Sequence, residues 1–445
     1  MLRIVYRRVA GLDVHKKTVV ATRMQVTEEE RVEWETKTFG TMTPDLLELH
    51  DWLYEWELSH VSMESTGDYW KPVFNILEDT FEVWLVNAQH VKHVSGRKTD
   101  VKDSEWLAEL MLYGLLKPSF IPPKSQRALR ELTRYRTRLV QERARVVNRV
   151  QKLLEGANIK LSSVVTDVMG VSARAMLAEI AVGQTDAALM ADLARGRMRN
   201  KISQLEKALT GIVQPHHRFL LIKQLSHIDF LDEQIEEINA AIEQQLESMS
   251  WPDEPSEPKI GEYTEEEPPV ADESELPLTW NTAVALLDTI PGVNRRIAEV
   301  MLAEMGPDMS RFPTADHLAS WAGLAPGNYQ SGGKRYSGRT TKGNKFLSSI
   351  MVQGAWSASR TKGTFLKARY HRLAARRGKK RAIMAVAHSM LISAWHMLTY
   401  QQPYQELGGD YFDERKKEAK VSYLVRRLEK LTGGSVSLEI QPVAA

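Results

Sequence analysis

The chain of 445 residues contains no cysteine. This absence excludes disulfide frameworks and thiolate metal sites, and it fits a reducing compartment. The N-terminal stretch MLRIVYRRVAGLDVHKK has no apolar core long enough for a secretory signal, and no uninterrupted apolar run of 18 residues follows. We therefore expect an intracellular protein that does not interact with a membrane.

Acidic residues are also absent from His317 to Gln405, whereas fifteen Lys or Arg lie between Lys334 and Arg381. Folding does not require such a stretch. A polyanionic partner explains it, because each neutralised phosphate releases counterions. The net charge of the whole chain is only +2, because residues 249–277 are rich in acid and proline. That segment has little to bury and is predicted to be a disordered linker.

A second basic segment lies in the middle of the chain. Lys124–Gly156 is predicted to be one long helix, with ten Lys or Arg against two Glu between residues 124 and 152. A solvated helix face is the plain interpretation, but pairs within the helix cannot balance this charge. We therefore predict a nucleic-acid contact through Arg127, Arg130, Arg134 and Arg138. Arg218–Ser248 is a second helix, whose apolar stripe is predicted to pack against the first helix or a second protomer.

The first segment alternates between strand and helix patterns. The predicted strands are Val9–Val14, Thr18–Val26, Val32–Phe39, Val61–Glu64 and Glu82–Val86, and the predicted helices are Pro44–Leu58, Trp70–Leu77 and Asp103–Leu116. This βββαβαβα order is that of the α/β ribonuclease H-like fold. The predicted domains are an α/β domain at 1–117, a helical coiled-coil region at 118–248, the acidic linker at 249–277, a mainly α domain at 278–405, and a helix with a tail at 406–445.

Four carboxylates are the candidate metal ligands in the first domain. Asp13 and Glu64 end the first and fourth strands, which are neighbours in this fold order. Asp100 and Asp103 begin the last helix three residues apart, and this spacing puts them on one helical face. Hard oxygen ligands of this kind select Mg²⁺ or Mn²⁺. Taken singly, Asp100 could cap the helix and Asp13 could end a strand in a turn.

A serine in a basic, glycine-rich segment is the candidate nucleophile. Ser331 is followed by Gly332 and Gly333, whose amides can approach an anion. The cations Lys334, Arg335, Arg339, Lys342 and Lys345 follow within fourteen residues. A hydroxyl here can attack phosphorus and hold the cut end covalently. Alternatively, Ser331 only donates a hydrogen bond to a phosphate, and Ser337 is a competing serine.

Residues 288–306 carry a helix, a Pro-Gly-Val turn and another helix, a pattern typical of helix-hairpin-helix contacts with DNA phosphates. Several histidines, namely His15, His60, His90, His93, His216 and His217, lack metal-ligand spacing with suitable partners. Surface or core roles are expected for them.

The chain resembles bacterial insertion-sequence transposases that have a RuvC-like DEDD domain in front and a serine-bearing transposase domain behind, the enzymes described as bridge-RNA-guided recombinases. The resemblance rests on GLDVHK, MESTGDYW, RKTDVKDSEWLAEL, IPGVNRRIAEVMLAEMG and WAGLAPGNYQSGGKRYSGRTTKGNKFL. It implies that Asp13, Glu64, Asp100 and Asp103 are the four acidic positions and that Ser331 is the nucleophile.

The resemblance further implies a composite site of metal cluster and serine, to which two protomers can contribute. The partners it implies are donor and target DNA, a bridge-type non-coding RNA that pairs with both, and further copies in a dimer or tetramer. It implies the prokaryotic cytoplasm, with association to the nucleoid in the active state. Two alternatives remain: a RuvC-like nuclease that uses water, and an architectural nucleic-acid-binding protein whose carboxylates are structural.

Overall fold

The structure is a computed structural model that describes residues 3–64, 67–87, 103–249, 279–327, 329–337, 340, 342–414, 417–435 and 437. These residues fall into two compact units, one ending at Pro123 and the other beginning at Lys124. The predicted acidic linker, apart from Met249, lies outside the described residues, as does most of the predicted tail.

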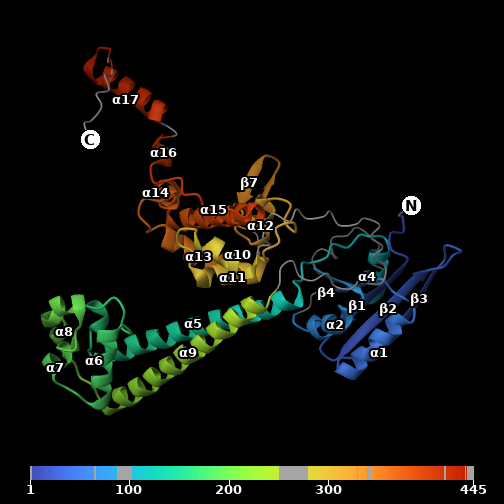
Figure 1. The fold of residues 1–445 in the computed structure, drawn as a ribbon, viewed down its shortest axis with the longest axis horizontal. Helices are drawn as coiled ribbons and strands as arrows, with labels where there is room; N and C mark the ends of the chain where they lie inside the picture. Colours follow the sequence, from blue (N-terminus) through green and yellow to red (C-terminus); the bar gives the residue numbers. More distant parts are fainter. Residues whose placement is uncertain are drawn as a thin grey trace. The chain divides into compact units, whose positions relative to one another are not determined.

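The first unit is built on a five-stranded mixed sheet (Figure 1). Its strands are β1 (Arg8–Val14), β2 (Thr18–Val26), β3 (Val32–Gly40), β4 (His60–Glu64) and β5 (Glu82–Val86), in the spatial order β3-β2-β1-β4-β5. β2 is antiparallel to β1 and β3, whereas β4 is parallel to both β1 and β5. The five predicted strands and the adjacency of the first and fourth strands are therefore confirmed.

Among the described residues, three helices cover the two faces of this sheet, α1 (Thr43–Tyr54), α2 (Trp70–Leu77) and α4 (Asp103–Leu112). Alternate residues of each strand point to opposite faces. Leu12 and Met63 therefore pack with α1 and α2, whereas Val9 packs with α4. The last helix was predicted to reach Leu116 but ends earlier, since Gly114 has a φ of +64° and takes the chain out of the helix.

The second unit begins with two long helices, α5 (Lys124–Gly156) and α9 (Pro215–Ser248). They pack side by side and antiparallel, with the side chain of Gln245 donating to the carbonyl of Ser125 near one end. At the other end they are joined through α6 (Val171–Val182), α7 (Ala187–Ala191), α8 (Ile202–Leu209) and the short 3₁₀ turns Leu161–Ser163 and Gly196–Lys201 (Figure 1). Both long helices are thus found where the apolar spacing predicted them.

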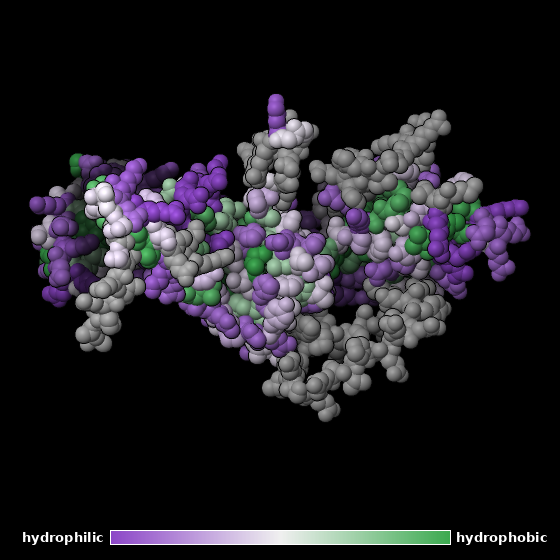
Figure 2. Space-filling model, turned by 90° about the horizontal axis from the view of Figure 1, so that it is seen from above, coloured by the Kyte–Doolittle hydropathy of each residue, from purple (hydrophilic) through white to green (hydrophobic). Residues whose placement is uncertain are grey.

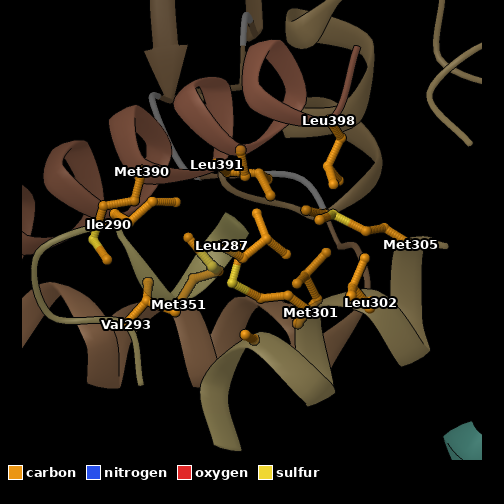
Figure 3. Close-up of a cluster of buried hydrophobic side chains, with 14 of the residues drawn as sticks. Leu287, Ile290, Val293, Met301, Leu302, Met305, Met351, Met390, Leu391 and Leu398 are labelled. Atoms are coloured by element: carbon orange, nitrogen blue, oxygen red, sulfur yellow. The ribbon is translucent and has the colours of Figure 1, made fainter. Parts of the chain in front are cut away.

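The remaining described elements of this unit are mostly helices. They are α10 (Trp280–Asp288), α11 (Arg295–Met305), α12 (Ala315–Trp321), β6 (Tyr329–Ser331), β7 (Lys334–Ser337), α13 (Lys345–Ala358), α14 (Phe365–Arg377), α15 (Lys379–Tyr400), α16 (Tyr411–Glu414) and α17 (Lys417–Thr432). Figure 3 shows leucine, methionine and other apolar side chains of α10, α11, α13 and α15 meeting in the core. Leu129 of α5 and Leu246 of α9 belong to the same core, so the base of the long pair is part of this helical domain.

One described helix, α15, is long and apolar enough to cross a membrane by length and composition. Half of that stretch is buried inside the protein, which is the pattern of a core helix. On the face drawn in Figure 2, the described side chains are predominantly hydrophilic, and the hydrophobic ones lie in small separate groups.

Candidate functional site

Two of the four predicted carboxylates end neighbouring parallel strands. The pairing of β1 with β4 runs to Leu12 opposite Met63, and Asp13 and Glu64 are the next residues on the two strands. Because side chains alternate along a strand, both carboxylates belong to the face opposite that of Leu12 and Met63. This is the α4 face of the sheet.

The start of α4 is held tightly against that face. The hydroxyls of Ser104 and Thr22 are 2.9 Å apart and both are buried. Gly11 allows the close approach, because a Cβ there would lie 2.2 Å from the carbonyl oxygen of Ser104. Asp103, the first residue of α4, therefore begins on the same face as Asp13. Asp100 lies outside the described residues.

Asp13 lies beside a histidine of the following turn. Asp13 Oδ2 lies 3.0 Å from Nε2 of His15, and Asp13 retains 25% of its side-chain exposure. Among the residues that the structure describes, no three Asp, Glu or His side chains are grouped closely enough to hold a metal ion. The donor chemistry still fits a hard cation, since Asp13 and Glu64 follow neighbouring strands on the face that α4 covers, and carboxylate oxygens are the ligands such cations prefer. The sequence interpretation gave His15 a surface or core role, and only its two-residue spacing from Asp13 hinted at the contact.

The serine segment folds as a β-hairpin, which the sequence interpretation treated only as a loop. Ser331 ends β6 and is the register partner of Lys334, the first residue of β7. Gly332 and Gly333 form the two-residue turn, with φ values of +55° and +76°. Such a turn needs positive φ at both positions, so these glycines are explained by the backbone itself. A Cβ on either glycine would meet no atom within 4 Å, so the tip is open.

The cations of this segment are described only in part. The side chains of Lys334, Lys342 and Lys345 are exposed. The side chains of Ser331 and Arg335, and the whole of Arg339, lie outside what the structure describes. The geometry of an attack by Ser331 is therefore left as a prediction.

A buried carboxylate ties α5 to the helix that follows the hairpin. Glu304 of α11 is completely buried and accepts hydrogen bonds from Arg134 Nε at 2.6 Å and Nη2 at 2.8 Å. Asn344 Nδ2 donates to the same carboxylate at 2.6 Å. The Asn344 side chain also caps α13 by accepting from two backbone amides. Glu304 thus connects the basic helix to the first turn of α13.

Arg130 completes this network. Its guanidinium donates to the backbone carbonyls of Ala303 at 3.1 Å and of Glu304 at 2.7 Å. Burial lowers the pKa of Arg130 to about 10, although the Glu304 carboxylate opposes this shift. Arg130 and Arg134, which the sequence assigned to nucleic acid, are therefore engaged inside the protein.

Two further arginines of α5 are also neutralised by acids from other helices. Arg136 donates to Glu299 of α11, and both side chains are buried. Arg143 forms an ion pair with Asp232 of α9. The charge imbalance of α5 is thus partly balanced from outside that helix. Arg127 is half-buried, whereas Arg138 is exposed and lines a cavity of about 320 Å³ together with Lys345.

The segment 288–306, predicted as a helix-hairpin-helix, runs from the end of α10 into α11. Its turn packs against α13, because a Cβ on Gly292 would lie 2.5 Å from the carbonyl oxygen of Gly354. Asn294, which stands where glycine is common in such motifs, caps α11 by accepting from the amide of Ile297. Packing and capping thus account for these residues, and a DNA contact there stays a prediction.

Comparison with known proteins adds two family matches. Residues 10–159 match a family model described as "Transposase", the DEDD domain of IS110 elements. Residues 284–371 match a second model, described as "Transposase IS116/IS110/IS902 family". Together the two models cover more than half of the chain, and the first includes all four predicted acidic positions while the second includes Ser331.

Several curated proteins are similar over shorter stretches. A transposase for insertion sequence element IS1111A from Coxiella burnetii is 31% identical over 154 residues, 33% of this chain and 39% of that protein. A pilin gene-inverting protein from Moraxella bovis is 30% identical over 129 residues, 28% of this chain and 40% of that protein. The putative transposase y4rJ from Sinorhizobium fredii is 26% identical over 316 residues, 67% of this chain and 65% of that protein. The chain thus matches about two fifths of the length of the first two relatives.

Proposed function

The chain belongs to the IS116/IS110/IS902 family of transposases, and from this premise we propose that it cuts and rejoins DNA strands with a metal-dependent carboxylate site and a serine nucleophile. The observation that carries the proposal is the placement of Asp13 and Glu64 on adjacent parallel strand ends beneath the start of α4. Relatives named as inverting a pilin gene favour a recombinase over a simple nuclease.

The carboxylates would hold the metal. Asp13, Glu64 and Asp103, joined by Asp100, provide hard oxygen ligands for Mg²⁺ or Mn²⁺. When bound, such ions neutralise charge on a phosphodiester undergoing in-line displacement. Gly11 allows α4, which begins with Asp103, to pack closely on β1.

The serine would perform the covalent step. The Ser331 oxygen forms a bond to phosphorus as the bond to one DNA oxygen breaks. The serine proton is released to solvent, and the departing DNA oxygen takes up a proton. A hydroxyl of another strand then attacks the same phosphorus and frees the serine, so the energy of the bond is conserved for rejoining.

The choice of DNA would come from a partner RNA. We propose, from the family resemblance, that a bridge-type RNA pairs with donor and target DNA and that two or four copies of the chain assemble in the prokaryotic cytoplasm. The exposed cations Arg138, Lys334, Lys342 and Lys345 are the described residues best suited to phosphate contacts. Arg127, Arg335 and Arg339 complete that proposed set.

A denaturing gel tests the proposal. Purified chain is incubated with Mg²⁺, RNA transcribed from the flanks of its element, and end-labelled junction DNA. We expect a protein–DNA adduct that is lost in Ser331→Ala and Asp13→Asn but survives in the matched control Ser337→Ala. Free cut DNA made equally well by Ser331→Ala would instead indicate a nuclease that uses water. Binding without any cleavage, unchanged in Asp13→Asn, would indicate an architectural protein.

A further inference from the structure

A cavity of about 690 Å³ lies in the helical domain among α12, α14 and α15. This volume is typical of sites for small organic ligands. The polar and aromatic residues on its walls include Asp316, Arg369, His388, Ser393, His396 and Tyr400. None of these residues belongs to the carboxylate site or to the serine hairpin, so the proposed reaction leaves the cavity without a role.

Arg369 gives this cavity an anion-binding group. Its Nε atom is buried and has no hydrogen-bond partner among the residues that the structure describes. A buried donor without a partner costs about 1–3 kcal/mol. Because Nε has almost no exposed surface, an acceptor in the cavity would reach it and remove that cost only after a shift of the Arg369 side chain. Asp316 is the only carboxylate among the described residues that line the cavity, and the surrounding sequence contains no acid from His317 to Gln405. An anionic ligand therefore fits better than a cationic one.

Two exposed rings form a flat surface at the same cavity. His396 and Tyr400 lie one turn apart on α15 and stack with their planes 10° apart and their centroids 5.9 Å apart. Tyr400 remains 62% exposed, so its ring is available for a further stacking partner. The neighbouring wall is fixed, because the indole of Trp395 donates to the carbonyl of Phe312 at 3.1 Å. Nucleobases stack on such rings regardless of their sequence.

We infer that this cavity binds one unpaired nucleotide of DNA or RNA, with its phosphate beside Arg369 and its base stacked on the His396–Tyr400 pair. A free phosphate would leave the rings unused, and an apolar ligand would leave the guanidinium unpaired. The inference rests on the proposed function, since cutting and rejoining strands exposes unpaired nucleotides, and it adds a binding site distinct from the reacting groups.

Fluorescence anisotropy with three labelled 12-mer probes tests the inference. The probes are single-stranded DNA, single-stranded RNA and a blunt DNA duplex, each titrated with the full chain at one fixed salt concentration. Tyr400→Ala is expected to raise the Kd for the preferred single strand roughly 5- to 150-fold, the range that loss of one stacked base gives. Its Kd for the duplex is expected to change less than twofold. The tighter of the two single strands identifies the source of the nucleotide.

Matched variants control for charge and for folding. Arg376→Met removes an exposed charge from the same helix as Arg369, and Tyr423→Ala removes an exposed ring from α17. Arg369→Met should weaken single-strand binding beyond the effect of Arg376→Met. Because Arg369 is partly buried and its loss could disturb the fold, the exposed Tyr400 carries the decisive comparison. Single-strand binding by Tyr400→Ala equal to that by Tyr423→Ala overturns the inference.

The two proposals fail in different ways. Single-strand binding that Tyr400→Ala weakens as expected, in a chain that forms no adduct with junction DNA, contradicts the proposed function and supports the cavity. An adduct that forms normally, together with unchanged single-strand binding in Tyr400→Ala, contradicts the cavity and supports the proposed function.

Discussion

The carboxylate of Glu304 is expected to be one of the main electrostatic supports of the helical unit. Glu304→Gln keeps the size of the side chain but removes its charge and turns one acceptor into a donor. The new amide nitrogen would face either the Arg134 guanidinium or the Asn344 amide, and both of these groups are donors. Arg130, whose side chain is only 15% exposed, would lose its nearby counter-ion.

The magnitude follows from the burial of the partners. Removing one partner of a buried ion pair costs about 3–5 kcal/mol, because the other charge remains uncompensated. The Arg134 side chain is 34% exposed, so water takes over part of its solvation. We therefore expect the free energy of unfolding of this unit to fall by ~2–4 kcal/mol in Glu304→Gln. This corresponds to a decrease in Tm of ~4–12 °C.

Differential scanning calorimetry of the full chain measures this effect. Glu243→Gln is the matched control, because Glu243 pairs with Arg295 at 2.9 Å on the surface, with 57% of its side chain exposed. Its loss should cost less than about 0.5 kcal/mol. Adding Arg134→Met to both wild type and Glu304→Gln completes a double-mutant cycle, with an expected coupling of about 1–3 kcal/mol. A Tm of Glu304→Gln equal to that of Glu243→Gln would refute the reasoning.

Three further predictions concern the other sites. Gly11→Ala would push α4 away from β1, so the free energy of unfolding of the first unit should fall by ~1–3 kcal/mol and adduct formation should fall sharply. Gly156→Ala is the control and should change neither, because a Cβ there meets no atom within 4 Å. Burial lowers the pKa of His388, with Asp316 opposing and Arg369 adding to the shift. The folded chain then binds fewer protons than the unfolded chain, so stability should fall as the pH drops below about 6.5, and Tm should fall less steeply there in His388→Gln. EDTA should abolish the adduct and added Mg²⁺ should restore it; an adduct that persists in EDTA contradicts the carboxylate site.

The sequence predicted the strands of the first unit to within one residue, since local patterns determine them, but the first helix, predicted to reach Leu58, ends at Tyr54. Runs of β-branched residues mark the strands, and the order of strands and helices along the chain places Asp13 beside Glu64 in the sheet. The errors lie at helix ends, where the backbone conformation of a single residue determines whether the helix continues. Gly114 ends α4 through its positive φ, and nothing in the apolar spacing reveals that position.

The serine hairpin was missed for a related reason. The strands β6 and β7 are only three and four residues long, too short for an alternating pattern to stand out. The Gly332–Gly333 pair was nevertheless a hairpin signal, because two consecutive glycines suit a turn with positive φ at both positions. The same pair was instead interpreted as an approach for phosphate, and the turn explains its conformation without a ligand.

The basic helix shows most clearly why charge counts alone do not assign partners. Arg130, Arg134 and Arg138 follow one another at intervals of four, so they form a single ridge on α5. Arg130 and Arg134 donate hydrogen bonds to Glu304, which lies about 170 residues further along the chain. No property of the α5 sequence itself indicates this partner. Only Arg138 continues past that network to an open cavity, where Lys345 also lies. Of the four arginines predicted to contact nucleic acid, the exposed one, Arg138, therefore lies at the end of the ridge, beside the first turn of α13. Arg138→Met should accordingly weaken duplex DNA binding and reduce its salt dependence with no loss of stability, whereas Arg134→Met should lower stability first.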